Sequence, residues 1–503
     1  MYKIGTRGSL LAVTQATLIK HQLESISGRA FELVLIKTQG DQVTDKPLWQ
    51  LDGKDFFTKE LDEALINGKV DLVIHSYKDL GSERPAQIKL GAITERSYAH
   101  DILLVPQENV DKLKKWTGEF KVGTSSPRRI TNLTSQLASY LSNQPITIKC
   151  EMLRGNVNTR IQKLRDGQYH AITLALAGLD RLAQGDKSKS ELKALLQNMN
   201  FVVLPLSTFP AAAAQGALAI EHAIHRTDDG ALAAIIEKLH HVPTSEEVSR
   251  ERLAFKSYGG GCHLAVGIHV REMDGNYLHF HRGEKDGQQI QIKKREGVTP
   301  PAQLPAAVFL GQANHPGVIV DSHFKKIPTG SVAPTTNRHV FVTTAHTLPT
   351  LQLPYRTLWS AGTETHKKMV KEGHWVNGSA DGLGTQEIQK LALSPALQMM
   401  MGDSAWLVLS HANTKSALGD VFVGYRQEMQ QPSTAEIEQL KKVTHAWWSS
   451  YPQYEAYTKL IPEMTRAQAY CGLGKTWHEF RHRNLTVMSL TDHHEFLQLM
   501  GKK

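Results

Sequence analysis

Basic residues gather at three places where a predicted strand gives way to a predicted helix. Arg7 follows the opening strand in TRGS, Arg128 and Arg129 end the run GTSSPRR, and Arg154 and Arg160 bound RGNVNTR. Backbone N–H groups, hydroxyls and guanidinium groups at a helix start form an anion site, and ligands of open α/β sheets bind at the carboxyl ends of strands. The three loops therefore predict a cleft for a ligand with several carboxylates or phosphates.

These arginines also have a plainer interpretation. Most surface charges are solvated or pair weakly with neighbouring acids. That interpretation suits one isolated arginine better than three clusters at strand ends. Arginine at a helix start opposes the helix dipole, and an anion site is a reason to tolerate that cost.

Two further motifs carry groups that could react. HSYKDL places Asp79 beside Lys78 after a predicted strand, where a carboxylate among cations can stabilise a developing cation or shuttle a proton. A helix cap or a structural ion pair is the alternative for Asp79. GGGC (Gly259–Cys262) presents a thiol on a glycine loop, which fits a covalent attachment point. The alternative there is inert core, as for most lone cysteines.

Composition limits the fold classes. The chain has 503 residues, which predicts about three to five domains. Hydrophobic residues make up 41% and charged residues 21%, which fits a globular protein and not a disordered chain. The three cysteines are far apart without a CxxC pair, so neither a disulfide framework nor a metal site is expected. Cys150 and Cys471 lie in apolar, strand-like runs and are expected to be inert.

Charge and hydropathy limit the partners. The net charge of +9 is small for this length and only 7% of residues are aromatic, so we expect no nucleic-acid partner. The sequence has no run of 18 apolar residues and no secretory signal pattern. We therefore expect no membrane partner and a location in the reducing cytoplasm.

The elements that must position these residues alternate between short apolar strands and amphipathic helices, the pattern of parallel sheets covered by helices. Phe201–Pro205 is expected to be a strand that returns to the first α/β unit, which makes the second unit an insertion. Further along, a helix and antiparallel strands predict a small α+β domain, and a stretch rich in Pro, Thr, Ser and Gly predicts a linker. The first six strands are expected at Lys3–Gly5, Phe31–Lys37, Leu72–His75, Lys121–Gly123, Ile146–Lys149 and Ala171–Leu176.

In these motifs and their order the sequence resembles the porphobilinogen deaminase (hydroxymethylbilane synthase) family of tetrapyrrole and haem biosynthesis. The resemblance extends from residue 1 to about 270, and the small domain is expected to continue to about 325. The matching blocks are RGSLLA, KTQGD, GKDFFTKELDEAL, HSYKDL, GTSSPRR, RGNVNTRIQKL, ITLALAGLDRL, AQGALAIE and GGGCHLAVG.

The resemblance implies a transferase with two periplasmic-binding-protein-like α/β lobes and a small α+β domain. Cys262 would carry a covalent dipyrromethane cofactor, to which four porphobilinogen units are added with loss of ammonia to give hydroxymethylbilane. Asp79 would be catalytic, stabilising positive charge on the pyrrole nitrogens as each amine leaves. The carboxylates of the cofactor and growing chain would be bound by Arg7, Ser9, Lys78, Ser125, Ser126, Arg128, Arg129, Arg154, Gly155, Arg160 and Arg181. Lys54, Phe57 and Gln215 match more weakly, and His100 stands where the family tends to have arginine.

The C-terminal region resembles uroporphyrinogen-III synthase, the next enzyme, more weakly. The matches SAGTETHKKMVKEG, WLVLSHANTKSAL, VGYRQ, WWSSYPQYEAY and CGLGKTWHEF correspond to roughly the later half of that family. We therefore expect an additional α/β domain that is truncated, and either synthase activity or a structural or docking remnant. The candidate site positions are Tyr425, Ser449, Ser450 and Thr476.

The resemblances together predict a domain order. A non-catalytic, two-lobed anion-binding protein is the alternative function, and Cys262 discriminates because a binding module needs no such thiol. The deaminase part is expected to be monomeric. The expected divisions are 1–98 with 200–220 (first deaminase domain), 99–199 (second), 221–325 (cofactor-cysteine domain), 326–338 (linker) and 339–503 (synthase-like domain).

Overall fold

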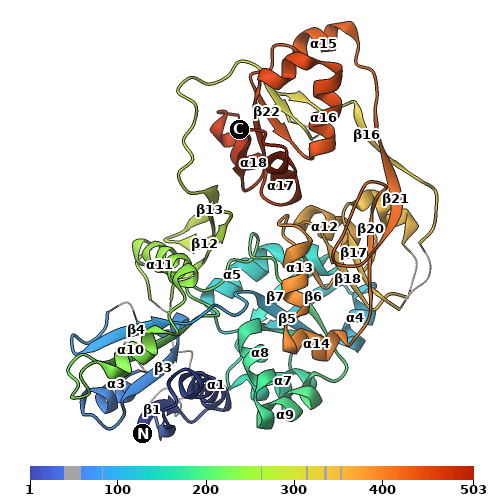
Figure 1. Cartoon of the computed structure of the whole chain (residues 1–503). Helices are drawn as coiled ribbons and strands as arrows, with labels where there is room; N and C mark the ends of the chain where they lie inside the picture. The colour runs from blue at the N-terminus through green and yellow to red at the C-terminus, as the bar shows by residue number, and fades with distance from the viewer. Residues whose placement is uncertain are drawn as a thin grey trace. The chain divides into compact units, whose positions relative to one another are not determined.

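The computed structural model describes residues 1–38, 58–81, 83–261, 263–312, 315–333, 337–351 and 354–502. The chain forms two compact units, which Figure 1 shows coloured along the sequence. The first unit comprises Met1–Glu272, Phe280–Ile292 and Leu391–Gly402, and the second comprises Met273–His279, Lys293–Lys390 and Asp403–Lys503.

The first lobe of the first unit is built on a five-stranded sheet in the order β2-β1-β3-β10-β4. β1 is parallel to β2 and β3, whereas β10 is antiparallel to β3 and β4. Apolar residues of the helices, such as Ile19, Leu23 and Ile236, pack against the sheet. The elements are β1 Tyr2–Arg7, α1 Leu10–Ser27, β2 Phe31–Ile36, α3 Lys59–Ile66, β3 Leu72–Ser76, η2 Tyr77–Asp79, β4 Ile88–Ile93, β10 Leu218–Ala223 and α10 Ala231–Glu237.

The second lobe repeats this topology with a sheet in the order β7-β6-β8-β5-β9. β6 is parallel to β7 and β8, and β5 is antiparallel to β8 and β9. The elements are β5 Asp101–Pro106, α4 Gln107–Leu113, β6 Gly118–Gly123, α5 Pro127–Gln136, α6 Ala138–Leu141, β7 Ile146–Glu151, α7 Val157–Arg165, β8 Ala171–Ala175, α8 Leu176–Gln184, α9 Asp186–Leu196 and β9 Met199–Val203.

Two crossing segments join the lobes. Residues 94–100 lead from β4 to β5, and residues 204–217 lead from β9 back to β10. The strand expected at Phe201–Pro205 therefore does not return to the first lobe, because β9 pairs with β5 and β10 makes the return. An apolar run predicts a buried strand but does not identify the sheet that accepts it.

The part of the chain that follows these two lobes contains helix α11 (Val242–Ser257) and a three-stranded sheet in the order β11-β12-β13. Its strands are β11 Ala265–Met273, β12 Asn276–Lys285 and β13 Gln288–Arg295. Asp-Gly pairs at 274–275 and 286–287 have positive φ at both residues, the geometry of type I′ turns in antiparallel hairpins. The predicted class of α/β lobes followed by a small α+β part is confirmed.

The second unit contains two sheets. A parallel sheet has the order β15-β14-β22-β23-β24. Its elements are β14 Val308–Leu310, β15 Ile319–Val320, α15 Thr434–Leu440, β22 His445–Trp448, α16 Tyr451–Leu460, η4 Pro462–Arg466, β23 Gln468–Gly472, α17 Lys475–His482, β24 Met488–Leu490 and α18 His493–Leu499.

The other C-terminal sheet has the order β16-β21-β20-β17-β18-β19, and only the β16–β21 pair is antiparallel. Helix α14 accompanies this region in sequence but belongs to the first unit. The elements are β16 Phe324–Pro328, β17 His339–Val342, η3 Ala345–Thr350, β18 Thr357–Ser360, α12 Thr363–Lys371, β19 Gly378–Ser379, α13 Thr385–Ala392, α14 Pro395–Met401, β20 Trp406–His411 and β21 Asp420–Met429.

These sheets correct two expectations for the C-terminal half. Residues 308–328, assigned from the sequence to the third domain and the start of the linker, form β14, β15 and β16, which pair with C-terminal strands. The region therefore has two lobes and is not truncated after one. The strands at 308–320 are two or three residues long, and β14 finds a partner, β22, more than 130 residues later, so local sequence gave no sign of the sheet.

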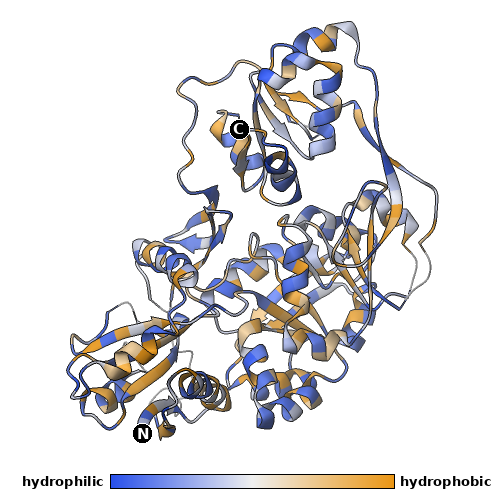
Figure 2. Ribbon diagram, viewed as in Figure 1, coloured by the Kyte–Doolittle hydropathy of each residue, from blue (hydrophilic) through white to orange (hydrophobic). Residues whose placement is uncertain are grey.

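Hydropathy follows this layering. Figure 2 shows hydrophobic residues concentrated on the strands, with hydrophilic residues on much of the surrounding helices and loops. In the described part of the chain, none of the helices has the length and hydropathy that a bilayer crossing needs.

Candidate active site

The carboxyl edge of the first sheet carries four of the predicted site residues. Arg7 ends β1, and Lys78 and Asp79 lie in η2 directly after β3. Because β1 and β3 are parallel neighbours, these residues lie at the same edge of the sheet. Ser9 caps α1, where its Oγ accepts the N–H of Ala12 at 3.3 Å. Its hydroxyl therefore fixes the start of the helix that follows Arg7.

The second sheet presents its predicted residues in the same way. Ser125 and Ser126 follow β6, Arg154 and Gly155 follow β7, and Arg181 lies in α8 directly after β8. β6 is a parallel neighbour of both β7 and β8. The structure thus brings these residues to one edge, as strand order requires.

Local hydrogen bonds hold the two loops of that edge together. Ser125 Oγ donates to the carbonyl of Leu153 at 2.8 Å and accepts its N–H at 3.0 Å. Arg160 Nε donates to the carbonyl of Gly155 at 2.7 Å. Gly155 has φ +116°, a region that favours glycine. The RGNVNTR loop is therefore pre-formed around its glycine.

Arg128 and Arg129 share a buried carboxylate that the sequence analysis missed. Arg128 Nη1 donates to Asp101 Oδ2 at 2.8 Å, and Arg129 donates to both Asp101 oxygens at 3.2 and 2.7 Å. Asp101 is 1% exposed, and the two arginines are 5% and 8% exposed. The neighbouring guanidinium groups hold the pKa of Asp101 well below its usual range, against the opposing effect of burial. In this structure the two arginines therefore bind the carboxylate of Asp101, at the start of β5, and have a structural role.

Gln215 connects this carboxylate to the reactive motif. Its Nε2 donates to the carbonyl of Ala99 at 2.6 Å and to Asp101 Oδ1 at 2.9 Å. Its Oε1 accepts from Lys78 Nζ at 3.4 Å. Ala99 and Gln215 lie on different crossing segments, so the two segments meet at this fully buried side chain.

Asp79 lies near three cations, Lys78, Arg160 and Arg181, which form no ion pair with a carboxylate within 4.0 Å among the described residues. Burial, together with Arg129 and Arg128, lowers the pKa of Lys78 to about 8, while Asp79 and Asp101 oppose the shift. Burial also lowers the pKa values of Arg160 and Arg181 to about 10, with Asp79 again opposing.

We call Asp79, Lys78, Arg160 and Arg181 the Asp79 cluster. Arg181 Nη2 donates to the carbonyl of Gly216 at 2.6 Å, and Arg160 Nε donates to a backbone carbonyl. Burial destabilises the protonated forms of these basic side chains, and a bound anion stabilises them again. The cluster is therefore suited to bind carboxylates around one catalytic carboxylate.

Helix α11 ties the small α+β part of the chain to the crossing segments. Glu251 accepts from Arg96 Nη2 at 2.8 Å, from the N–H of Ala214 at 2.7 Å and from His269 Nδ1 at 3.1 Å. Glu251 is buried, yet Arg96 and His269 lower its pKa to about 2. This second buried carboxylate also lay outside the sequence motifs.

The next residue of α11, Arg252, holds the HSYKDL loop. Arg252 lies 4.6 Å from the ring centroid of Tyr77 and donates to the carbonyls of Leu80 and Gly81 at 3.0 and 2.8 Å. A cation over an aromatic face and two charge-assisted hydrogen bonds fix the loop that carries Asp79. The sequence signal was available in RERLAFK, but its partners are about 170 residues earlier.

The three glycines before Cys262 adopt backbone conformations that favour glycine. Gly259, Gly260 and Gly261 have φ values of +98°, +63° and +90°, which side chains rarely adopt. Cys262 itself lies outside the described residues, as do Lys54 and Phe57. Their roles stay predictions.

One acidic cluster resembles a metal site but already binds an arginine. Asp62, His75 and Glu221 bring their ligand atoms within 4.8 Å of one another. Arg84 donates to Asp62 at 3.0 and 2.5 Å and to Glu221 at 2.9 and 2.7 Å. The arginine supplies the positive charge that a metal ion would bring, so we assign no metal here.

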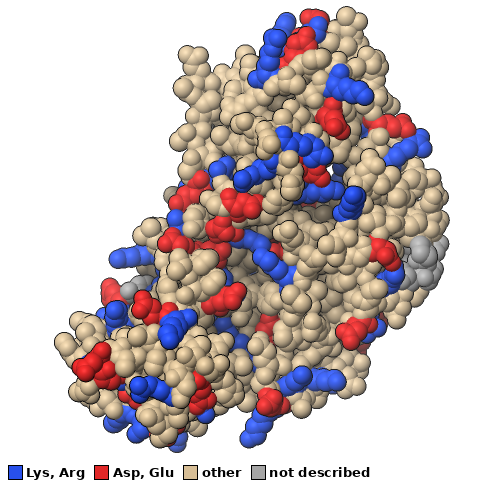
Figure 3. Space-filling model, in the orientation of Figure 1, with Lys and Arg blue, Asp and Glu red and all other residues tan. Residues whose placement is uncertain are grey.

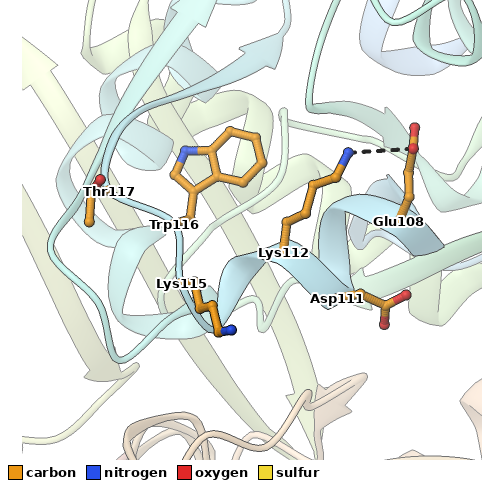
Figure 4. A pocket seen from close by; sticks show the side chains of 6 residues that line it. All are labelled: Glu108, Asp111, Lys112, Lys115, Trp116 and Thr117. Carbon is orange, nitrogen blue, oxygen red and sulfur yellow. Dashed lines mark hydrogen bonds and ion pairs between the residues drawn. The ribbon is translucent and has the colours of Figure 1, made fainter.

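A surface pocket of about 680 Å³ lies at the end of α4 and contains none of the predicted site residues. Figure 4 shows Lys112 paired with Glu108 along one side of it. Figure 3 shows basic and acidic side chains interspersed over the visible face of the molecule. The candidate arginines are therefore distinguished by their place at strand ends and not by a surface patch.

Comparison with known proteins gives the family. Residues 2–232 match the family model "Porphobilinogen deaminase, dipyromethane cofactor binding domain". A porphobilinogen deaminase of Nostoc sp. is 36% identical over 278 residues, covering 55% of this chain and 79% of that protein. The chain belongs to the porphobilinogen deaminase family. A relative from Lachnospira eligens is 38% identical over 280 residues, covering 55% of this chain and 86% of that protein.

The chain spans about half the length of another relative, the chloroplastic porphobilinogen deaminase of Euglena gracilis (38% identity over 275 residues, 54% of this chain). Among solved structures, similarity is found to a uroporphyrinogen-III synthetase from Helicobacter pylori, with TM-score 0.28, 10% identity and coverage of 39% of this chain and 95% of that one. A TRAP periplasmic solute binding protein from Pseudomonas putida F1 has TM-score 0.25 and 10% identity, covering 51% and 81%.

Membership in the deaminase family confirms the predicted family, the transferase class and the dipyrromethane-binding domain. The individual site residues stay predictions that the geometry above supports to different degrees. The Asp79 cluster fits ligand binding directly, whereas Arg128 and Arg129 have Asp101 as their main partner.

Replacing Asp101 is expected to destabilise the deaminase region. Asp101→Ala leaves two buried guanidinium groups without their carboxylate, which costs about 3–5 kcal/mol in the free energy of unfolding. Chemical denaturation at pH 7.5 measures it, with the exposed Asp111→Ala as the control, expected to change stability by about 0.5 kcal/mol or less. Because the folded-state pKa of Asp101 is lowered, the wild-type advantage should shrink as pH falls below about 4. Equal stability of the two variants would contradict this role.

Binding of substrate carboxylates is expected to weaken above pH 8. Lys78 is charged below its pKa of about 8 and loses its charge as pH rises through that value. KM for porphobilinogen should therefore rise between pH 8 and 9.5 in the wild type. Lys78→Arg, which stays protonated, should delay the rise. The same pH profile in both proteins would remove Lys78 as its cause.

Proposed function

We propose that this chain is a porphobilinogen deaminase that joins four porphobilinogen units into hydroxymethylbilane, releasing one ammonia for each. The observation that carries the proposal is the Asp79 cluster, in which one exposed carboxylate lies among three cations with lowered pKa values. Each porphobilinogen brings two carboxylates, so a growing chain of them suits this surplus of positive charge. Family membership supports the same reaction.

The residues present suit a dipyrromethane group. Its acidic side chains match the Arg, Lys and Ser donors at the two sheet edges, and the loop of three glycines with positive φ leads directly to Cys262. When bound through that thiol, the group supplies the pyrrole carbon to which the first unit is attached. Arg154, Arg160 and Arg181 would hold the carboxylates in fixed positions.

Asp79 would act on the substrate. As the amine leaves, positive charge develops on the pyrrole nitrogen, and a carboxylate nearby stabilises that charge more strongly in the transition state than in the ground state. Lys78, adjacent in sequence and hydrogen-bonded to Gln215, would hold a substrate carboxylate beside it. Arg252 would keep the Asp79 loop in place through its contacts with Tyr77 and Gly81.

We also propose a cytoplasmic location and a monomeric deaminase part. Three scattered cysteines suit a reducing compartment. A pure anion-binding protein remains the competing function, and it predicts neither a modified Cys262 nor turnover.

The deaminase proposal predicts a covalent adduct and a dependence on Asp79. The purified protein should be heavier than its sequence by a dipyrrole, and Cys262→Ser should lack this mass. Asp79→Ala should keep the mass and the fold but lose turnover by about 100-fold or more, as for loss of a group acting on the reacting atoms. Intact mass spectrometry and porphobilinogen consumption measure the two effects. An unmodified wild type that binds no porphobilinogen would exclude the deaminase.

A second activity, uroporphyrinogen-III synthesis by the C-terminal region, is favoured by a basic cluster within the second unit. Lys326 of β16 has a pKa lowered by burial and by Lys368 of α12. The pKa of His411, at the end of β20, is lowered by burial, Lys475 and Lys326, and that of His346 by burial, Lys326 and Lys368. These groups come from both C-terminal lobes, since Lys475 begins α17.

The four candidate positions from the sequence lie close to this basic cluster. The ring of Tyr425 is 5.5 Å from that of His411. Thr476, next to Lys475, donates from Oγ1 to the carbonyl of Ser449 at 3.4 Å, and Ser450 caps α16. A polycarboxylate such as hydroxymethylbilane would relieve the mutual repulsion of the cations.

The synthase proposal predicts the isomer formed from porphobilinogen. The full chain should yield uroporphyrin III after oxidation of its product, whereas a remnant would yield only the spontaneous type I isomer. Lys326→Ala with Lys475→Ala should shift the product toward type I while porphobilinogen consumption is unchanged. Chromatographic separation of the isomers measures this shift. A wild-type product of type I alone would contradict the second activity.

A further inference from the structure

One segment of the C-terminal region belongs to the deaminase unit. Residues 391–402 are part of the first unit, although residues 293–390 and 403–503 on either side belong to the second. Helix α14 makes up most of this segment and packs on α8, α9 and β9 of the second deaminase lobe. We call residues 391–402 the docking segment.

A buried carboxylate holds the start of this segment. Asp180 Oδ1 accepts from Ser394 Oγ at 2.5 Å and from the N–H of Ala396 at 3.1 Å. Asp180 is 1% exposed, and Ser394, Ala396 and Leu397 are fully buried. Ser394 Oγ also accepts the N–H of Leu397 at 3.2 Å. The hydroxyl thus links the helix start to a residue more than 200 positions earlier.

The docking segment supplies the hydrogen-bond partners of this carboxylate. Asp180 Oδ2 is buried and has no hydrogen-bond partner among the described residues. Burial raises the pKa of Asp180 to about 6, and Ser394, Ala396 and Arg181 oppose that rise. Among the described residues, this buried carboxylate accepts hydrogen bonds from the docking segment alone, so it is placed to recognise that segment.

Helix α8 joins the docking segment to the substrate-binding residues. Arg181 follows Asp180 directly and donates to the carbonyl of Gly216 in a crossing segment. Gly216 has φ +95°, and a Cβ there would lie 2.6 Å from the carbonyl oxygen of Ser97 in the other crossing segment. α8 also packs on α1, the helix that Ser9 caps. A shift of α8 would therefore move Arg181 relative to both crossing segments.

We propose that residues 391–402 are an intramolecular docking segment that binds the C-terminal region to helix α8. The hydrogen bond between Ser394 and Asp180 holds the segment in place, and the docked segment positions Arg181. The dock is a property of the fused chain, because the deaminase lobe supplies the carboxylate and the C-terminal region supplies the occupant. Its effect on porphobilinogen rests on the proposed deaminase function, whereas the docking itself does not.

Hydrogen exchange of the full-length protein tests the dock directly. Asp180→Ala and Ser394→Ala should each raise exchange of the 391–402 peptide by about ten-fold or more, because a buried donor or acceptor loses its partner. In the double variant, amide exchange of the 391–402 peptide should be no faster than in the single variant with the faster exchange. Asp180→Asn keeps an Oδ1 acceptor and should retain most of the protection. Unchanged exchange in Asp180→Ala, or additive effects in the double variant, would overturn the dock.

The control is Ser433→Ala. Ser433 caps α15 and forms a capping box with Glu436 in the second unit, so its loss should loosen α15 and leave the 391–402 peptide unchanged. Faster exchange of that peptide in the control would mean that any lost helix cap loosens the region, which would also overturn the proposal.

Kinetics test the link from the dock to Arg181. Asp180→Ala and Ser394→Ala should raise KM for porphobilinogen to the same extent, with kcat and the dipyrrole mass unchanged. Ser433→Ala should have wild-type KM. A wild-type KM in both dock variants would overturn the positioning of Arg181. If the wild type shows no turnover at all, the deaminase proposal has failed, and the exchange experiment still decides the dock.

Discussion

The buried carboxylate of Asp101 holds together the place where the two deaminase lobes meet. It stands at the start of β5, directly after one crossing segment, and accepts four hydrogen bonds from Arg128, Arg129 and Gln215. An isolated buried carboxylate would be very costly, and charged, hydrogen-bonded partners offset that cost. Gln215 brings in the other crossing segment. The site depends on this contact because it connects Arg128 and Arg129 at the edge of the second sheet, through Gln215, with Lys78 at the edge of the first.

This interaction also separates Arg128 and Arg129 from Arg160 and Arg181. Arg128 and Arg129 have their charge balanced by Asp101 within the protein. Arg160 and Arg181 donate to backbone carbonyls and have pKa values lowered to about 10. A backbone carbonyl satisfies a donor without neutralising it, so positive charge remains available around Asp79. Arg160 and Arg181 therefore keep charge that an incoming carboxylate can neutralise, whereas Arg128 and Arg129 do not.

Local sequence predicted which residues follow which strands, and the structure places the expected residues at the strand ends. Those expectations rest on short-range features: an apolar strand, a glycine or serine turn, a helix start. Asp101, Glu251 and Arg252 were missed because their partners lie 18 to 175 residues away. The sequence around an Asp or Glu that precedes an apolar strand does not show whether its carboxylate is solvated or buried. The pairing of β9 with the second sheet was missed for the same reason.

The two-lobed C-terminal region was harder to foresee because one of its lobes is assembled from distant pieces. β14 and β15 come before the other lobe in sequence, and β22 to β24 come after it. Antiparallel β16 and β21 are the two strands where the chain enters and leaves that other lobe. The same arrangement, an intervening lobe reached by two connections, occurs in the deaminase region with its two crossing segments. In both regions the chain passes twice between lobes, which allows lobes to move as bodies without breaking a sheet.

Both regions also gather poorly neutralised cations from two lobes, around Asp79 in one and around Lys326 and His411 in the other. Like charges held together destabilise the empty protein, and an anion bound among them removes that cost. A ligand whose carboxylates are spread along a chain can reach cations on both lobes, whereas a small anion reaches few. On the proposed functions, specificity for a long polycarboxylate would therefore arise from how the cations are distributed between lobes. The number of cations alone would not give it.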